Sequence, residues 1–580
     1  MDTNPYRAAS VRSLLTTGII LLASAMGSVA GHAAPPLRPG PIVWHEDDRR
    51  PIPVPSERDP GIVRDFYDDS ISRPAARHLD PEPLSRKIGT IFGGQVAREA
   101  VNVNALDEVP NSAWFTNRIG LFAHTPEEVR AGPGEAGPSR EAPWTVVAGK
   151  VGGVTAGFQI RDAAGGRFLL KFDPKDQWGT TSSAGAVSVA LFHAAGYNVP
   201  EDVVVDFTRE DLRLSDGVRI ERRGEEVALT EALLDEILAD VPRSSDGGFR
   251  ALASRFLSGK PLGPFDYKGR RQDDPNDHFE HEHRRELRGL RLLAAWTHHF
   301  DMKQHNSLDM YVGEPGAGHV VHHLIDFAST LGAGGRGAEP ILGREYGIDL
   351  PAGFGRLLAL GLHEDPWRSV ERPVGLDEVG YYDAESFHPT KFKPQQPNTA
   401  FAHLTDRDGY WAAKIVSSFR DEHIRAAVER GRYADPDAAA YVARVLGARR
   451  DRIAAHWFAK VAPLDYFSRS GSQVHFRDLA RERLPHELVA RASLGRYRAR
   501  VARVSAERER TGRWSEWIEL PEPSADLGSG PLAAALNGSG AGAGGEYLAL
   551  QLVAAREGGW SPAVTAYSTL DGDRIVAVER

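Results

Sequence analysis

Acidic residues, a lysine and an asparagine interrupt a stretch that is otherwise largely apolar and rich in histidine. The stretch "WTHHFDMKQHNSLDMYV" covers residues 296–312 and holds Asp301, Lys303 and Asn306; "HHLIDFASTLG" follows closely and holds Asp326. Carboxylate and amide oxygens are the ligands that Mg²⁺ prefers, and a nearby lysine can neutralise phosphate oxygens. The neighbouring histidines could instead supply zinc ligands. The residue types therefore indicate either a phosphoryl-transfer site or a histidine metal site.

A phosphoryl-transfer site depends on positioning and charge neutralisation more than on covalent chemistry. Its expected parts are a glycine turn for close backbone approach, a strand lysine for phosphate oxygens, metal-binding oxygen ligands and an aspartate near the acceptor hydroxyl. The sequence holds such residues in that chain order: Gly152, Gly153 and Gly157, then Lys171, then Asp301, Lys303 and Asn306, and last Asp326. Because the ordered combination is far less probable by chance than any one part, it favours phosphoryl transfer.

Predicted strands and helices surround these residues. The segments "WTVVAGK", "VGGVTAGFQIRD" and "GRFLLKFDP" predict three strands, "SAGAVSVALFHAAGYNVP" predicts a helix that stops at Gly196, and "EDVVVDF" predicts a further strand. Helical spacing of leucines in "HEHRRELRGLRLLAAWTHHF" predicts a helix that ends just before Asp301. The strands "SLDMYV" and "HVVHHLIDF" are expected to pair as a hairpin between Asn306 and Asp326.

The sequence around the acidic residues resembles that of a known protein family. "HFDMKQHN" resembles the protein-kinase catalytic loop H-R-D-x-K-x-x-N at His299, Asp301, Lys303 and Asn306, and "LIDFA" resembles the D-F-G segment, with Ala328 in place of the glycine. On these grounds the chain resembles atypical bacterial members of the protein-kinase-like superfamily, akin to the HipA-like and CotH-like kinases. The resemblance implies an α+β, two-lobed protein-kinase-like fold with a small β-rich lobe and a mainly helical large lobe.

The resemblance also implies a role for each matching residue. Asp301 would orient the acceptor hydroxyl and take its proton, and Lys303 would stabilise charge on the γ-phosphoryl group. Asn306 and Asp326 would hold Mg²⁺, and Lys171 would contact the α and β phosphates of ATP under the glycine turn. The implied function is ATP- and Mg²⁺-dependent phosphoryl transfer to a hydroxyl on a protein, a sugar or a small molecule.

The chain departs from the family pattern in ways that set further expectations. The helix after Lys171 contains no glutamate to pair with the lysine, so Glu201 or another acidic residue is expected to take that place. The long separation between Lys171 and Asp301 implies an insertion, and no A-P-E motif follows Asp326. We expect Lys171 to lie near Asp326 across a cleft, and Asn306 to converge with Asp326.

Two other functions compete with an active kinase. A kinase-shaped binding or scaffold protein of the cell envelope, without catalysis, would explain the missing helix glutamate and the scarcity of nucleotide outside the cytoplasm. A zinc-dependent hydrolase would use the histidine-rich segments, although no H-E-x-x-H motif is present. The histidines concerned are His278, His281, His283, His298, His299, His305, His319, His322 and His323.

Composition narrows the function classes further. The formal net charge of −9 is mild for 580 residues and implies no nucleic-acid partner. The absence of cysteine excludes thiol nucleophiles and cysteine-ligated metal centres. An N-terminal basic region, an apolar run and small residues at "SVAGHAAPP" predict a signal peptide, an exported periplasmic or secreted protein, and no membrane span after cleavage.

Shifts in composition predict five parts. The signal peptide would cover residues 1–33 and an N-terminal extension that wraps onto the core would cover 34–143. The small lobe would cover 144–210 and the large lobe, with its insertion, 211–495. A small C-terminal β domain would cover 496–580, where apolar alternation returns.

Overall fold

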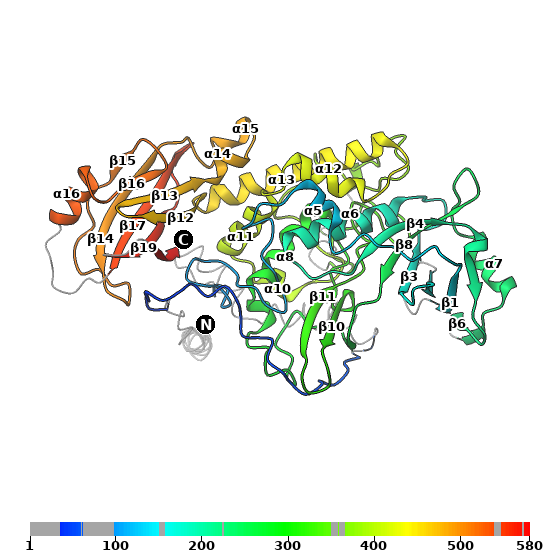
Figure 1. Ribbon diagram of the computed structural model, residues 1–580. Coiled ribbons are helices and arrows are strands. Elements are labelled where there is room, and N and C mark those ends of the chain that lie inside the picture. The colour runs from blue at the N-terminus through cyan, green and yellow to red at the C-terminus, as the bar shows by residue number, and fades with distance from the viewer. Residues whose placement is uncertain are drawn as a thin grey trace, which may run out of the picture.

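The computed structural model describes residues 35–59, 61, 98–149, 157–222, 225–349, 356, 358, 366–538, 547–570 and 574–580. The predicted signal peptide, at residues 1–33, lies outside the described residues. The fold mixes helices and sheets, so the predicted α+β class is confirmed. In Figure 1 one sheet lies at one end of the molecule, the C-terminal sheets lie at the other, and helices pack between them. Every helix among the described residues is too short or too polar to cross a bilayer.

A six-stranded sheet carries Lys171 and has the strand order β4-β8-β3-β2-β1-β5. All its pairings are antiparallel except that of β5 with β1. One face is filled by aromatic and aliphatic side chains, including Phe158, Phe168 and Phe172. The strands are β1 (Trp144–Gly149), β2 (Gly157–Arg161), β3 (Arg167–Phe172), β4 (Asp202–Phe207), β5 (Leu212–Leu214) and β8 (Phe249–Arg255).

Helix α6 (Thr180–Ala195) covers the other face of this sheet and is almost wholly buried. Its small side chains allow close approach, and Ala186 packs against Val204 and Leu252. The N-terminus has no side-chain cap of its own; instead the Asp173 carboxylate accepts hydrogen bonds from the backbone N–H groups of residues 179, 181 and 182 at 3.0, 2.9 and 2.8 Å. Because these N–H groups lack partners within the helix, Asp173 fixes where α6 begins.

An insertion separates β4 from β8. It contains β5, the hairpin of β6 (Arg219–Arg222) and β7 (Glu225–Ala228), and helix α7 (Glu231–Ala239). These strands are not among the elements predicted from the sequence. The strands have only three or four residues each, so their periodic signal is weak.

The central helices form the largest apolar core. Helix α8 (Arg285–Thr297) precedes the acidic loop, as predicted, and packs against α11 (Asp406–Val416) and α13 (Pro436–Lys460). Helices α10 (Thr399–Ala402), α12 (Asp421–Glu429) and α5 (Pro126–Ala131) complete the group. The mainly helical structure expected of the large lobe is absent from the described residues between 340 and 398, where turns dominate and the one continuous helix is the 3₁₀ segment Pro366–Ser369. Frequent glycine and proline there explain the difference.

The predicted hairpin is formed by β10 (Ser307–Val312) and β11 (His319–Leu324), with β9 (Lys260–Gly263) alongside β10. The N-terminal extension runs beside this sheet (Figure 1). Ile52 N donates to Gly318 O at 2.9 Å, and Leu37 N donates to Ala506 O at 2.7 Å. The described part of the extension therefore contacts both the hairpin and the C-terminal sheet.

The C-terminal β structure consists of two sheets around their own apolar core. The first sheet joins β12 (Leu464–Ser470), β13 (Gln473–Asp478) and β16 (Ser524–Asp526). The second joins β14 (Tyr497–Val504), β15 (Ile518–Leu520), β17 (Tyr547–Arg556), β19 (Val564–Thr569) and β20 (Ile575–Glu579), with β18 (Gly559–Trp560) beside β17. Short helices α14 (Leu479–Arg483), α15 (His486–Val489) and α16 (Gly530–Gly538) flank them. Because β12 and β13 belong to this core, it starts before the predicted boundary at residue 496.

Candidate functional site

Lys171 and Asp326 meet at the face of the six-stranded sheet that α6 covers. Nζ of Lys171 lies 3.0 Å from a carboxylate oxygen of Asp326, although 155 residues separate them in sequence. Lys171 is 9% exposed, whereas the side chain of Asp326 is 38% exposed. The lysine is thus buried in the sheet, and the aspartate presents a carboxylate that solvent and ligands can reach.

A second carboxylate, that of Asp202, faces Lys171 from within the sheet. Leu252 on β8 pairs with both Lys171 and Val204, so these three side chains share a face, and Asp202 precedes Val204 by two residues on the same face. Asp202 is fully buried. Burial lowers the pKa of the Lys171 ammonium, but the charges of Asp326 and Asp202 outweigh that effect and raise the pKa above its usual value.

Asp202 is the residue that the sequence analysis missed. Helix α6 supplies no acidic partner, as expected, but the suggested substitute, Glu201, pairs with Arg255 at 3.5 Å. Burial raises the pKa of the Asp202 carboxyl, and the charge of Lys171 opposes this rise only in part. The alternation of side chains along the strand "EDVVVDF" could have distinguished Asp202 from Glu201, because only one of two neighbouring side chains on a strand faces α6.

The acidic loop starts where α8 ends. His298 adopts a left-handed conformation with φ 57° and closes the helix. Nζ of Lys303 lies 3.0 Å from one carboxylate oxygen of Asp301 and 3.1 Å from the other. Nδ2 of Asn306 donates to the backbone oxygen of Asp301 at 2.7 Å, so the loop folds back on itself and fixes the position of the aspartate.

The β10–β11 hairpin returns the chain from Asn306 to Asp326. Ser307 pairs with Leu324, and Ile325 N donates to the backbone oxygen of Asn306 at 3.0 Å. Asp326 follows directly and adopts a left-handed conformation with φ 62°. No described residue donates a hydrogen bond to Oδ1 of Asn306. The hairpin therefore places an amide oxygen and a carboxylate at the same end of two paired strands.

Aromatic packing beneath the loop connects it to α6. Phe327 is fully buried, with its ring centroid 4.9 Å from that of Phe192 on α6 and 5.3 Å from that of His299. Burial lowers the pKa of His299 to about 4, so its ring is neutral at physiological pH. A neutral imidazole packs here as an apolar group and holds the two halves of the loop together.

The glycine turn is only partly described. Gly157 lies in β2 and pairs with Lys171 across the β2–β3 ladder. Gly152 and Gly153 lie outside the described residues. The structure therefore places one of the three predicted glycines directly beside the lysine.

Several histidines of the histidine-rich segments form hydrogen bonds within the fold. Among described residues, Glu280, Glu282 and His283 form the group whose possible metal-binding atoms lie within 4.8 Å of one another. Nδ1 of His283 accepts from Arg288 at 2.7 Å, so the ring hydrogen is on Nε2, which lies 3.4 Å from Glu280. A nitrogen that carries a hydrogen cannot bind a metal ion.

Two other histidines of the predicted zinc group are also engaged. His281 bonds through both ring nitrogens, to the Asp266 carbonyl and to Asp277, and His322 lies 2.6 Å from Asp309. Burial lowers the pKa of His281, but Asp277 outweighs this effect and raises it. A histidine held in its protonated form is a poor metal ligand, because both ring nitrogens carry hydrogen.

A scan against protein-family models found no match, and neither did searches of curated proteins and of solved structures. Inferences about activity therefore depend on the distances and charges of the residues described above.

Proposed function

We propose that this protein has a two-lobed, protein-kinase-like fold and transfers a phosphoryl group from ATP, with Mg²⁺, to a hydroxyl acceptor. The observation that carries the proposal is the 3.0 Å contact between Lys171 and Asp326, two residues brought together from distant parts of the chain. A buried lysine held by carboxylates next to an exposed aspartate suits a site that binds phosphate oxygens and a cation.

The order of the strands supports the proposal. Along the chain, the antiparallel strands β1, β2 and β3 precede α6, and β4 and β8 follow it. In the sheet these strands lie in the order β4-β8-β3-β2-β1, with α6 on the face that carries Lys171. The sheet would form the small lobe, and the helices from α8 to α13 the large lobe. The strand from which Lys171 projects lies at the centre of this sheet, where neighbours on both sides fix its backbone.

The oxygen atoms at the loop fit a magnesium ion. Mg²⁺ prefers oxygen ligands and is usually held by one or two carboxylates together with phosphate oxygens and water. Asp326 supplies an accessible carboxylate, and Asn306 supplies an amide oxygen to which no described residue donates. When bound, the ion would neutralise charge on the phosphate oxygens. Asn306 and Asp326 would hold it.

The remaining residues would orient the reactants. Lys171, fixed by Asp202, would bind phosphate oxygens with its ammonium group. Asp301 would orient the acceptor hydroxyl and accept its proton, while Lys303 would release one carboxylate contact to stabilise the transferring group. These roles need the loop geometry that Asn306 imposes on the Asp301 backbone.

A second candidate is nucleotide binding without transfer, as in an envelope scaffold. The observation that favours it is the ion pair between Lys303 and Asp301, with a hydrogen bond to one carboxylate oxygen, which neutralises the charge of the proton acceptor. Under either candidate the protein would be exported, in agreement with the N-terminal sequence. The two candidates differ in turnover and not in nucleotide affinity.

Calorimetry of ATP binding in the presence and absence of Mg²⁺ tests the proposal. The intact protein should bind ATP with Mg²⁺, and Asp326→Ala should abolish the metal-dependent part. Asp206→Ala is the matched control, since Asp206 lies on β4 but pairs with Arg432 at the surface. If the folded protein binds no nucleotide, the proposal is wrong. If it binds ATP but transfers phosphate to no hydroxyl acceptor or water, the non-catalytic candidate holds.

A further inference from the structure

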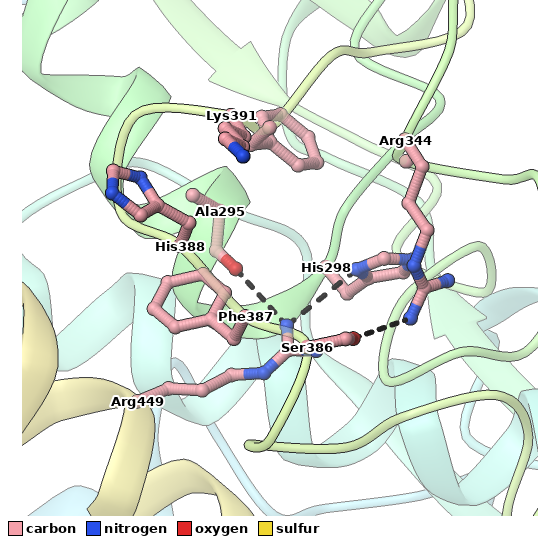
Figure 2. A pocket seen from close by; sticks show the side chains of 10 residues that line it. Ala295, His298, Arg344, Ser386, Phe387, His388, Lys391 and Arg449 are labelled. Atoms are coloured by element: carbon pink, nitrogen blue, oxygen red, sulfur yellow. Dashed lines mark hydrogen bonds between the residues drawn. The ribbon is translucent and has the colours of Figure 1, made fainter. Parts of the chain in front are cut away.

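A small cavity lies behind the acidic loop, on the far side of His298. It has a volume of about 50 Å³ and is enclosed by the end of α8, by α13 and by the chain from Gly343 to Phe392. Figure 2 shows that its labelled residues include three cationic side chains, those of Arg344, Lys391 and Arg449.

Arg449 is the buried cation of this cavity, at 1% exposed. Its Nε donates to Asp383 O at 2.8 Å, and its Nη1 donates to Ala295 O at 3.2 Å and lies 3.5 Å from Nδ1 of His298 (Figure 2). All these acceptors are neutral. No described residue accepts from Nη2, and no described carboxylate forms an ion pair with this guanidinium. A buried charge without a counter-ion is costly, and an anion would relieve that cost.

The other two cations increase the positive charge. Arg344 pairs with Asp383 at 3.0 Å and lies 3.5 Å from Oγ of Ser386, which also lines the cavity. The ammonium group of Lys391 forms no ion pair with a described residue and is exposed at the cavity rim. Asp383 is therefore the one described acid paired with any of the three cations, and the group keeps a net positive charge.

The titration of neighbouring groups agrees with this charge balance. Burial, followed by the charges of Arg449 and Arg344, holds the pKa of His298 well below its usual value. Burial lowers the pKa of Arg449 to about 10; Tyr382 and the Asp383 carboxylate oppose this only in part, and Arg344 acts in the same direction as burial. Both effects are expected where burial and neighbouring positive charge outweigh the one nearby carboxylate, that of Asp383.

We propose that this cavity binds a tetrahedral oxyanion, either as free inorganic phosphate or as the phosphoryl group of a phosphomonoester. The volume suits one such group, since a single water needs roughly 10–15 Å³ while drug-sized ligands fill roughly 300 Å³ or more. Guanidinium groups present paired N–H donors that match phosphate oxygens, and Arg344 and Arg449 both line the cavity.

The bound anion would act on the loop through Arg449. This residue holds the last turn of α8 at Ala295 and contacts His298, the residue that begins the acidic loop. An anion would fix the guanidinium and with it the start of the loop. The oxyanion site does not depend on the proposed kinase activity, because none of its cations belongs to the Lys171–Asp326 site.

Phosphate titration by calorimetry at constant ionic strength, with chloride as the reference anion, tests the inference on the whole protein. Phosphate should bind, and Lys391→Ala and Arg344→Gln should each weaken binding roughly tenfold. Lys460→Ala, an exposed change on the same helix as Arg449, should have no effect. Lys391→Ala is the decisive variant, because an exposed side chain can be removed without unfolding the protein.

Two results would overturn the inference. One is heat indistinguishable from that of chloride. The other is phosphate binding that survives Lys391→Ala and Arg344→Gln but is lost in Lys171→Met, because the phosphate would then occupy the proposed nucleotide site. A parallel titration with phosphoserine separates the sources: tighter binding than inorganic phosphate assigns a phosphomonoester, and equal or weaker binding assigns the free ion.

Discussion

Asp202 and Lys171 lie on the same face of one sheet, on two strands separated by β8, and the charge of each favours the charged form of the other at these buried positions. The acidic partner of the lysine therefore comes from a strand and not from the helix that covers the sheet. The position of this partner is set by the ladder that pairs β4 with β8.

We predict that Asp202→Asn weakens ATP binding roughly tenfold, because Lys171 loses one of the two charges that orient it. The control is Glu201→Gln, which changes the neighbouring acid that faces Arg255. Calorimetry of both variants with Mg²⁺ present makes the comparison. Equal losses in the two variants would show that position 202 has no special role.

Substitutions of Lys171 and Asp202 are expected to have coupled effects on the free energy of unfolding. Lys171→Met leaves the Asp202 carboxylate buried without its cation and should lower the free energy of unfolding by about 3 kcal/mol. Adding Asp202→Asn should recover much of that loss, since a neutral amide tolerates the site better. Urea denaturation of both single variants and the double variant measures the coupling. Additive losses would mean that the two groups do not interact.

Asp301→Asn should separate binding from transfer. The amide keeps the size of the side chain but cannot accept a proton, so we expect nucleotide affinity to change little and turnover to fall by about 10²–10⁴. The readouts are the affinity for ATP, measured by calorimetry, and the rate of ATP turnover, measured with each hydroxyl acceptor that is tested. A variant as active as the parent protein would remove Asp301 from the proposed chemistry.

The low pKa of His299 predicts acid sensitivity. Its folded-state pKa of about 4 lies below the unfolded value near 6.5, so the unfolded chain binds the proton more readily. The stabilising contribution is therefore complete above about pH 6.5 and is lost as the pH falls towards 4. Denaturation of His299→Gln should show a shallower loss of stability over this range than the parent protein. His278→Gln, at an exposed histidine, should follow the parent.

Gly196→Ala should loosen the contact between α6 and the N-terminal extension. Gly196 has φ 126°, and a methyl group there would lie 2.3 Å from the ring of Phe115. We expect a loss of about 1–3 kcal/mol and easier proteolysis of the extension. Gly217→Ala is the matched control, with φ 72° but open space around it, and should cost only about 1 kcal/mol. A larger effect at Gly217 would contradict the packing of Phe115 on α6.

Much of the local structure could be predicted from the sequence. The strand around Lys171, the helix that ends at Gly196, the helix before Asp301 and the hairpin from Asn306 to Asp326 all appear where hydrophobic periodicity and turn residues indicated. These features are local, because spacing of 2.0 or 3.6 residues is set within one element. The region after Asp326 was predicted less well, since glycine and proline override a weak helical pattern there.

By itself the sequence determined which chemical groups are present and in what order, including the lysine, the two aspartates and the asparagine of the candidate site. Only the tertiary structure decided that Asp202, and not Glu201, lies beside Lys171, because the choice depends on which face of β4 turns towards α6. The structure alone also gathered Arg344, Lys391 and Arg449 around one cavity. Their positions are set by the packing of α8, α13 and an irregular loop, and no spacing in the sequence encodes a contact among three such distant segments.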